Sequence, residues 1–176
     1  MPDSDASVSL TFADESHLAF NGFGYRDKNW GVRPFTEGLA YEYWGHARVG
    51  PYSIVYAITA LQGDAKIFRA IGFVSKQGKP LLTTCRPGSA VKVRPTGHND
   101  DFPPTKTSGL PSGYHIEFEL GKGRGVLEVD LTDLLVIAKL TGYYGRSSGK
   151  AIGRVVKDGY KSETFEGYAI AEQFTP

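Results

Sequence analysis

The sequence predicts an all-β fold, an antiparallel barrel of about ten strands that forms a single domain over residues 1–176. Glycine and proline are frequent, at 22 and 10 residues, and aromatic residues make up 12% of the chain. Turn signals separate short apolar runs about every ten residues. Amphipathic helical runs are missing. A barrel is favoured because closure removes exposed strand edges, and a two-sheet sandwich is the alternative.

The composition argues against several classes of function. The net charge is +1 and the charged residues are scattered, so neither nucleic acid nor an anionic membrane is an expected partner. The single cysteine, Cys85, cannot form an intramolecular disulfide, which fits a reducing compartment. Because no signal peptide or apolar run of about 18 residues occurs, we expect a cytoplasmic protein without membrane insertion. Residues 1–7 are polar and are expected to be disordered.

The strands are expected to follow one another along the chain at 8–12, 18–20, 39–49, 52–59, 66–75, 80–84, 90–94, 114–120, 126–131, 134–141, 151–156 and 164–174. Residues 95–112 form the longest irregular stretch and are predicted to be a lid or rim loop. Residues 143–150 are predicted to be a tight, glycine-rich connection.

The strand at 39–49 carries the densest group of functional side chains. Its period of two places four of them on one face: Glu42, Trp44, His46 and Arg48. If this face points into the barrel, Trp44 offers a stacking plane, His46 a proton shuttle and Arg48 a fixed cation for a substrate oxygen. The alternative is an ion-pair network running from Glu42 to Arg48 on the outer wall.

Aromatic side chains are the candidates for contacts with an apolar substrate: Tyr41, Tyr43, Tyr52, Tyr56, Phe20 and Phe68. The strand at 52–59 is apolar on both faces, so it is either covered on both sides or turns one face to a ligand. A lumen lined with aromatic rings and a few hydroxyls suits a terpenoid or a polyketide. The alternative is that these side chains are ordinary core residues.

The motif Gly22-Phe-Gly-Tyr-Arg-Asp-Lys-Asn-Trp-Gly31 resembles a signature of carotenoid 1,2-hydratases and of fungal lipocalin-like Diels-Alderases. The segments Tyr43-Trp-Gly-His-Ala-Arg-Val-Gly-Pro-Tyr-Ser-Ile-Val55 and Gly167-Tyr-Ala-Ile-Ala-Glu-Gln-Phe174 look like further blocks of the Diels-Alderases. The resemblance extends from about Ser9 to the C-terminus, but it covers only the C-terminal one of the two barrels that those enzymes usually have. It implies a lipocalin-like barrel, and the length is similar to that of single-barrel hetero-Diels-Alderases.

The resemblance also implies catalytic residues. The hydratases are understood to transfer a proton with the Tyr and Asp of this motif, which correspond to Tyr25 and Asp27. The alternative gives the motif a folding role, in which Asp27 and Asn29 hydrogen-bond a glycine-rich turn and Trp30 plugs one end of the barrel.

The resemblance therefore implies a cofactor-independent pericyclase acting on hydrophobic small molecules, and the spacing of His, Asp, Glu and Cys residues predicts no metal site. The expected reaction is an intermolecular hetero-Diels-Alder cycloaddition of a tropolone-derived quinone methide with a terpene olefin, in fungal secondary metabolism. Its candidate catalytic residues are His46, Arg48, Asp27 and Tyr25. A hydratase or cyclase and a non-catalytic binder of a hydrophobic metabolite are the alternatives, and a homodimer is left open.

Overall fold

The computed structural model describes residues 3–34, 37–88, 90–140 and 144–176, with the backbone alone for residues 64–68. The chain divides into two compact units, Met1–Trp30 and Gly31–Pro176, and the single domain stays a prediction. Every regular element in the described ranges is a β-strand, and the strands pair antiparallel, which confirms the predicted class. The same ranges contain no helix that is long and apolar enough to cross a membrane.

The first unit is a two-stranded hairpin. Its strands β1 (Ser4–Thr11) and β2 (His17–Gly24) pair along their whole length. The turn between them is fixed by Asp14, whose Oδ1 accepts hydrogen bonds from the backbone N–H and the hydroxyl of Ser16, at 3.0 and 2.6 Å. The ladder pairs Ser4 with Gly24, the last residue of β2. Strand β1 therefore begins within residues 1–7, for which the composition predicted disorder.

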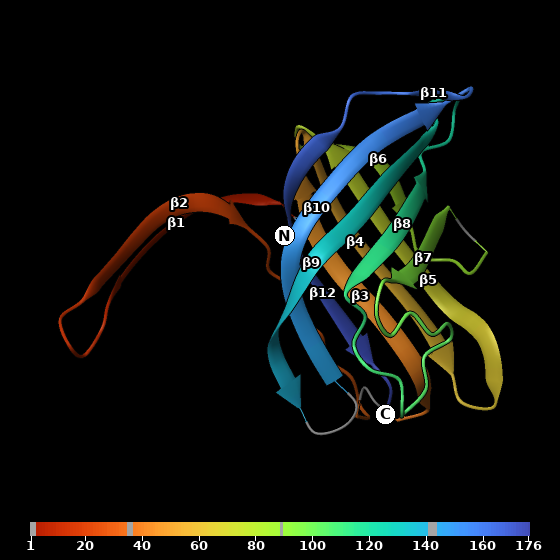
Figure 1. Ribbon diagram of the computed structural model, residues 1–176, viewed down its shortest axis with the longest axis horizontal. Helices are drawn as coiled ribbons and strands as arrows, with labels where there is room; N and C mark the ends of the chain where they lie inside the picture. The colour runs from red at the N-terminus through yellow and green to blue at the C-terminus, as the bar shows by residue number, and fades with distance from the viewer. Residues whose placement is uncertain (1–2, 35–36, 89, 141–143) are drawn as a thin grey trace. The chain divides into compact units, whose positions relative to one another are not determined.

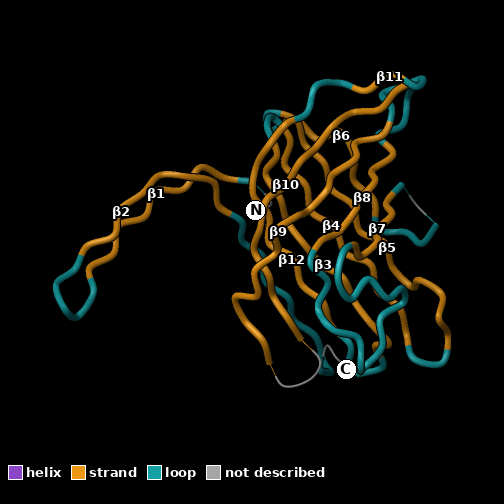
Figure 2. The backbone as a smooth tube through the Cα atoms, viewed as in Figure 1, coloured by secondary structure: helices purple, strands orange, loops and turns teal. Residues whose placement is uncertain are grey.

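The second unit is one antiparallel sheet. Its strands are β3 (Leu39–Val49), β4 (Tyr52–Leu61), β5 (Asp64–Lys76), β6 (Lys79–Thr84), β7 (Val91–Thr96), β8 (Gly113–Glu119), β9 (Val126–Leu140), β10 (Tyr144–Lys157), β11 (Tyr160–Lys161) and β12 (Phe165–Phe174). They are ordered β6-β5-β4-β3-β12-β10-β9-β8-β7, with β11 beside β10 (Figure 1). The traces of these strands cross in front of and behind one another because the sheet curls (Figure 2).

The core of the second unit lies on one face of the sheet. Alternate residues of β3 and β4 point into it, as the period of two requires, and β5, β7, β8, β9, β10 and β12 contribute to the same cluster. The sheet must therefore curl around a single core. Strand β4 is buried on both faces from Tyr52 to Ala60, which is one of the two arrangements that the sequence left open for it.

Closure of the barrel stays a prediction. No backbone ladder joins the outermost strands, β6 and β7, within the described residues. Each of these strands contains a proline, Pro80 or Pro95, which has no N–H to donate to a ladder and is therefore found at sheet edges. A side chain links the two ends of the sheet instead, because Arg124, in the turn after β8, donates from Nη2 to the carbonyl of Leu81 in β6 at 2.8 Å.

Strand β10 corrects the prediction of a connection at residues 143–150, because the strand begins at Tyr144. Its glycines allow close packing within a strand and do not form a turn. A Cβ on Gly145 would lie 2.2 Å from Leu110 Cδ1, and a Cβ on Gly149 would lie 2.5 Å from the carbonyl oxygen of Thr132.

Candidate functional site

Strand β3 divides the predicted site residues between two faces. Tyr41 and Tyr43 belong to the core. The even-numbered residues of the row lie on the opposite face and point away from that core: Glu42, Trp44, His46 and Arg48. The structure thus settles the direction that the sequence left open. At about 3.3 Å per residue, Glu42 lies about 20 Å from Arg48 along the strand, so these two side chains do not form a direct ion pair.

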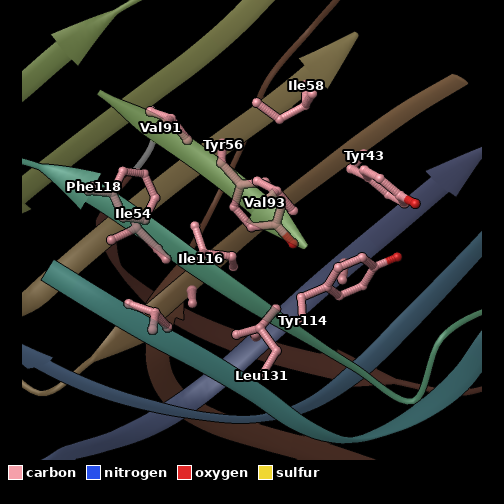
Figure 3. Close-up of a cluster of buried hydrophobic side chains, with 14 of the residues drawn as sticks. Tyr43, Ile54, Tyr56, Ile58, Val91, Val93, Tyr114, Ile116, Phe118 and Leu131 are labelled. Carbon is pink, nitrogen blue, oxygen red and sulfur yellow. The ribbon is translucent and has the colours of Figure 1, made fainter. Parts of the chain in front are cut away.

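The predicted aromatic contacts of the second unit are parts of the packed core, because Tyr41, Tyr43, Tyr52 and Tyr56 are all buried. Figure 3 shows Tyr43, Tyr56 and Tyr114, from three different strands, within one buried cluster. The hydroxyl of Tyr43 donates to the carbonyl of Asp101 at 3.4 Å. Burial raises the pKa of Tyr43 and Tyr56 above the usual range, so neither phenol is an acid or base near neutral pH. Their role as substrate contacts stays a prediction.

The predicted rim loop covers one end of this core. Phe102 of the loop lies face to face with Tyr43, with ring centroids 6.3 Å apart and an interplanar angle of 19°. Its edge meets Tyr41 at 6.0 Å, and the guanidinium carbon of Arg94 lies 3.9 Å from its ring centroid. The negative face of an aromatic ring attracts a cation, so the Arg94 guanidinium helps to hold the Phe102 ring in this position.

Glu42 is a buried acid on the other face of β3. It is 8% exposed, and its Oε2 accepts a hydrogen bond of 2.7 Å from Thr59 Oγ1, its partner residue on β4. Burial raises the pKa of Glu42, since the carboxylate loses hydration, and the negative charge of Glu172 raises it further. The Thr59 hydrogen bond and the charge of Arg69 oppose this shift. Glu42 is consequently the described carboxyl best suited to keep a proton.

Glu172 is a second buried carboxyl group on the same face. It lies on β12, paired across the ladder with Trp44 and diagonally next to Glu42, a separation of about 7–8 Å between Cα atoms. Arg146 of β10 holds it, with Nε donating to Oε1 at 2.6 Å and Nη2 at 2.5 Å from the same oxygen. Glu172 thus accepts hydrogen bonds from a cation, whereas Glu42 accepts one from a neutral hydroxyl and is also influenced by the charge of Arg69. Different environments for two neighbouring carboxyl groups separate their acid and base roles.

Aromatic rings lie beside this acid pair, which consists of Glu42 and Glu172. The indole of Trp44 stands between Glu172 on one neighbouring strand and Ala57 on the other. Phe174 is paired with Glu42 across the ladder, and its ring centroid lies 4.5 Å from that of Tyr144. The acid pair therefore sits on a partly apolar surface.

Three members of this arrangement were missed by the sequence analysis: Thr59, Arg146 and Glu172. The alternation of Tyr168, Ile170, Glu172 and Phe174 in the last strand is a signal that places Glu172 on one face, but it does not say which residue lies beside it. Arg146 was hidden because its segment was predicted to be a connection.

Tyr25 and Asp27 belong to the first unit. The hydroxyl of Tyr25 donates to Asp27 Oδ2 at 3.1 Å, so the two residues of the resembling motif do form a pair. Phe20 is half exposed on β2. Trp30 is 86% exposed, and its role as a plug stays a prediction.

Two further expectations concern Phe68 and metals. Phe68 lies in β5, but its side chain is outside the described residues. Among the residues that the structure does describe, no group of three or more His, Cys, Asp and Glu side chains is arranged to hold a metal ion.

Sequence comparison finds similarity to two curated proteins. The chain is 35% identical over 173 residues to the quinolone epoxide rearrangement protein penF of Penicillium thymicola, a match that covers 98% of this chain and 45% of penF. It is 34% identical over 176 residues to the quinolone epoxide rearrangement protein asqO of Emericella nidulans, covering 97% of this chain and 44% of asqO. The chain therefore spans less than half the length of these relatives. No family model matches it.

Structure comparison supports the fold. The crystal structure of CghA with Sch210972 matches with a TM-score of 0.67 and 17% identity, covering 99% of this chain and 53% of the CghA chain. A second crystal structure of CghA matches with a TM-score of 0.62 and 15% identity, covering 97% and 51%. At these identities the likeness concerns the fold alone. The chain thus has the fold of half of CghA and is similar in sequence to part of two quinolone epoxide rearrangement proteins.

Proposed function

We propose that this chain is an enzyme that isomerises an epoxide on a hydrophobic small molecule by acid catalysis, with Glu42 as the proton donor. The observation that carries this proposal is the buried Glu42 carboxyl, held by a neutral hydroxyl from Thr59 and placed beside the ionic pair of Glu172 and Arg146. Epoxide opening requires an acid, because the oxygen of the breaking C–O bond needs a proton, and burial raises the pKa of Glu42 above its ordinary value.

The chemistry is balanced without a cofactor. Glu42 gives its proton to the epoxide oxygen, and one C–O bond breaks with its electrons going to that oxygen. A hydrogen or carbon group then migrates with its bonding pair to the cationic carbon. The carbonyl forms as the O–H proton returns to the Glu42 carboxylate, so the net change is an isomerisation. The negative charge of Glu172 stabilises the cationic intermediate if the substrate lies over the acid pair.

The relatives support the reaction class. Both are named quinolone epoxide rearrangement proteins, and the similar region contains Glu42 and Glu172. Since this region is less than half of each relative, the whole activity, the substrate and the fungal biosynthetic setting are proposed for this chain by similarity.

An intermolecular hetero-Diels-Alder reaction is the second candidate. The observation that favours it is the aromatic surface beside the acid pair, formed by Trp44, Phe174 and Tyr144. Glu42 would protonate the hydroxyl of a tropolone alcohol, water would leave with that proton, and loss of a second proton to the Glu42 carboxylate would give the quinone methide. The olefin would then add while both partners rest on the rings. His46 and Arg48 lie about 13 and 20 Å from Glu42 along the strand, so they would contact other parts of the substrates.

A hydratase or cyclase is the third candidate. The hydrogen-bonded pair of Tyr25 and Asp27 in the first unit supports it, because a phenol and a carboxyl group joined in this way can relay a proton. In this case the acid pair of the second unit would have a structural role.

The experiment compares the purified chain with its Glu42→Gln variant. The amide keeps the shape and accepts the Thr59 hydrogen bond, but it has no acidic proton. With a quinolone that bears an alkyl epoxide, we expect the rate of isomerisation, followed by chromatography and NMR of the product, to fall about 10²- to 10⁴-fold. Glu163→Gln, at an exposed position, is the matched control and should retain full activity.

The alternatives give other results. Full activity in Glu42→Gln and loss in Asp27→Asn would assign the chemistry to the first unit. Adduct formed from a tropolone alcohol and a humulene-type olefin, with no epoxide product, would favour cycloaddition. Tight binding of these compounds without any rate above that of a protein-free control would make the chain a binder.

A further inference from the structure

A hollow lies where the loop between β7 and β8 meets the ends of β9, β10 and β12. Its volume is about 270 Å³, and residues 106–110 of the loop form one side of it. Pockets for drug-sized ligands are generally about 300–1,000 Å³, so this one suits a compact molecule with a single ring. We call it the mouth pocket.

The inner wall of the mouth pocket belongs to the core side of the sheet. Lys139, Gly145, Gln173 and Tyr43 lie in one row across four neighbouring strands. Gln173 is 3% exposed and Tyr43 is fully buried, which shows that this row faces inward. Leu110 packs over Gly145, where a side chain would collide with it, and supplies an apolar surface to the pocket.

Two nearly buried polar side chains line the pocket. Gln173 donates from Nε2 to the carbonyl of Gly109 at 3.2 Å, which fixes the carboxamide and leaves its second N–H available. Thr175 is 4% exposed and lines the same pocket. A carboxamide N–H and a hydroxyl that line a hollow can both donate hydrogen bonds to a polar ligand.

The charge of the lining is positive. Lys106 and Lys139 line the pocket, and no carboxylate is among its lining residues, all of which the structure describes. Asp101 is exposed, and its Oδ2 accepts a hydrogen bond of 2.9 Å from Ser108 Oγ, which belongs to a lining residue. An anion in the pocket would therefore meet two ammonium groups and neutral donors.

We propose that the mouth pocket binds a small aromatic carboxylate or enolate, with its anionic oxygens toward Lys106 and Lys139 and its ring against Leu110. Gln173 and Thr175 donate hydrogen bonds to the same oxygens. The polar groups proposed for the anion differ from the acid pair, because Gln173 points to the core face of β12 whereas Glu172 points to the other face. Tyr144 is shared, since it lines the pocket and also hydrogen-bonds Glu172.

The test is an NMR titration of the ¹⁵N-labelled chain with benzoate, observed at the side-chain NH₂ of Gln173. Benzamide is the neutral isostere, and inorganic phosphate is an anion without a ring. We expect saturable shifts with benzoate alone. Lys106→Met and Lys139→Met should each weaken benzoate binding about two- to fivefold, as expected for partly exposed ion pairs, and the double variant should weaken it more. Lys161→Met is the control, because Lys161 lies in β11, beside the other end of β10. It should leave benzoate binding unchanged.

Three results would overturn the proposal. Benzamide binding as tightly as benzoate would show that charge is not recognised. Phosphate binding as tightly would show a general attraction of anions without a ring site. An absence of saturable shifts would show that the pocket does not take this class of ligand. These measurements report binding and do not depend on turnover. A negative result here can therefore be distinguished from a failure of the proposed epoxide reaction.

Discussion

Thr59 donates a hydrogen bond of 2.7 Å to Glu42 from the neighbouring strand, and both side chains are buried although they face away from the core of the sheet. The donor is a neutral hydroxyl, so it orients the carboxyl group without providing the positive charge that would fully stabilise its ionised form. Burial raises the pKa of the Glu42 carboxyl in this pair, which leads to two predictions about pH.

Glu42→Gln should become more stable relative to the parent chain as the pH rises. The pKa of Glu42 is raised above its ordinary value of 4.5, so the folded state binds more protons than the unfolded state between these two pKa values. Its stabilising contribution is therefore complete below pH 4.5 and is lost as the pH rises through the raised value. Urea unfolding of both proteins from pH 4 to pH 8 measures this difference. A constant difference across the range would contradict the shift.

Thr59→Val should raise the pKa of Glu42 further. Valine has the shape of threonine but no hydroxyl, and the Thr59 hydrogen bond is the main influence that lowers this pKa. We expect the descending alkaline limb of the pH–rate profile to move to higher pH. Thr59→Ser keeps the donor and should leave the limb in place. If the limb is the same in all three proteins, Glu42 is not the group that titrates in the rate.

Arg146→Met should destabilise the fold by about 1–3 kcal/mol. The substitution removes the cation that pairs with Glu172, which is 8% exposed, and leaves a buried carboxylate without its cationic partner. The double variant Arg146→Met/Glu172→Gln should recover much of the loss, because it removes the charge as well. Equal losses in the single and double variants, measured by urea unfolding, would show that the pair is not coupled.

Gly45→Ala should destabilise the fold by about 1–3 kcal/mol through overpacking. A Cβ at this position would lie 2.4 Å from the hydroxyl oxygen of Tyr56 and 2.5 Å from its Cζ. Gly22→Ala is the control, because nothing lies within 4 Å of the added carbon there. Thermal unfolding of the two variants should separate them clearly, and equal midpoints would show that the Tyr56 ring moves aside freely.

Tyr56→Phe should leave the stability unchanged or raise it by up to about 1 kcal/mol. Tyr56 is 0% exposed, and in the described part of the chain its hydroxyl has no hydrogen-bond partner, so the folded state carries the cost of an unpaired polar group. Tyr43→Phe loses the hydrogen bond to Asp101 and should instead cost about 0.5–1.5 kcal/mol. A large loss in Tyr56→Phe would reveal a partner for this hydroxyl.

The local pattern of the sequence determined much of the fold. The period of two in residues 39–49 and the doubly apolar run at 52–59 are properties of neighbouring residues, and both appear in β3 and β4. The alternation in residues 39–49 also placed Glu42 on the opposite face from Tyr41 and Tyr43, since alternate side chains on a strand must point to opposite faces. Glycine was ambiguous, because Gly145 and Gly149 serve close packing in β10 whereas the same residue type forms turns elsewhere.

Only the tertiary structure decided which face of β3 meets the core and which residues lie beside Glu42. Thr59, Glu172 and Arg146 come from three other strands, and their proximity depends on strand order and register, which no short segment encodes. The elevated pKa of Glu42 arises in the same way, because removal of a carboxyl group from water depends on all the chain that covers it. The sequence by itself thus determined the alternation of side chains, and the assembled sheet determined which of them form a site.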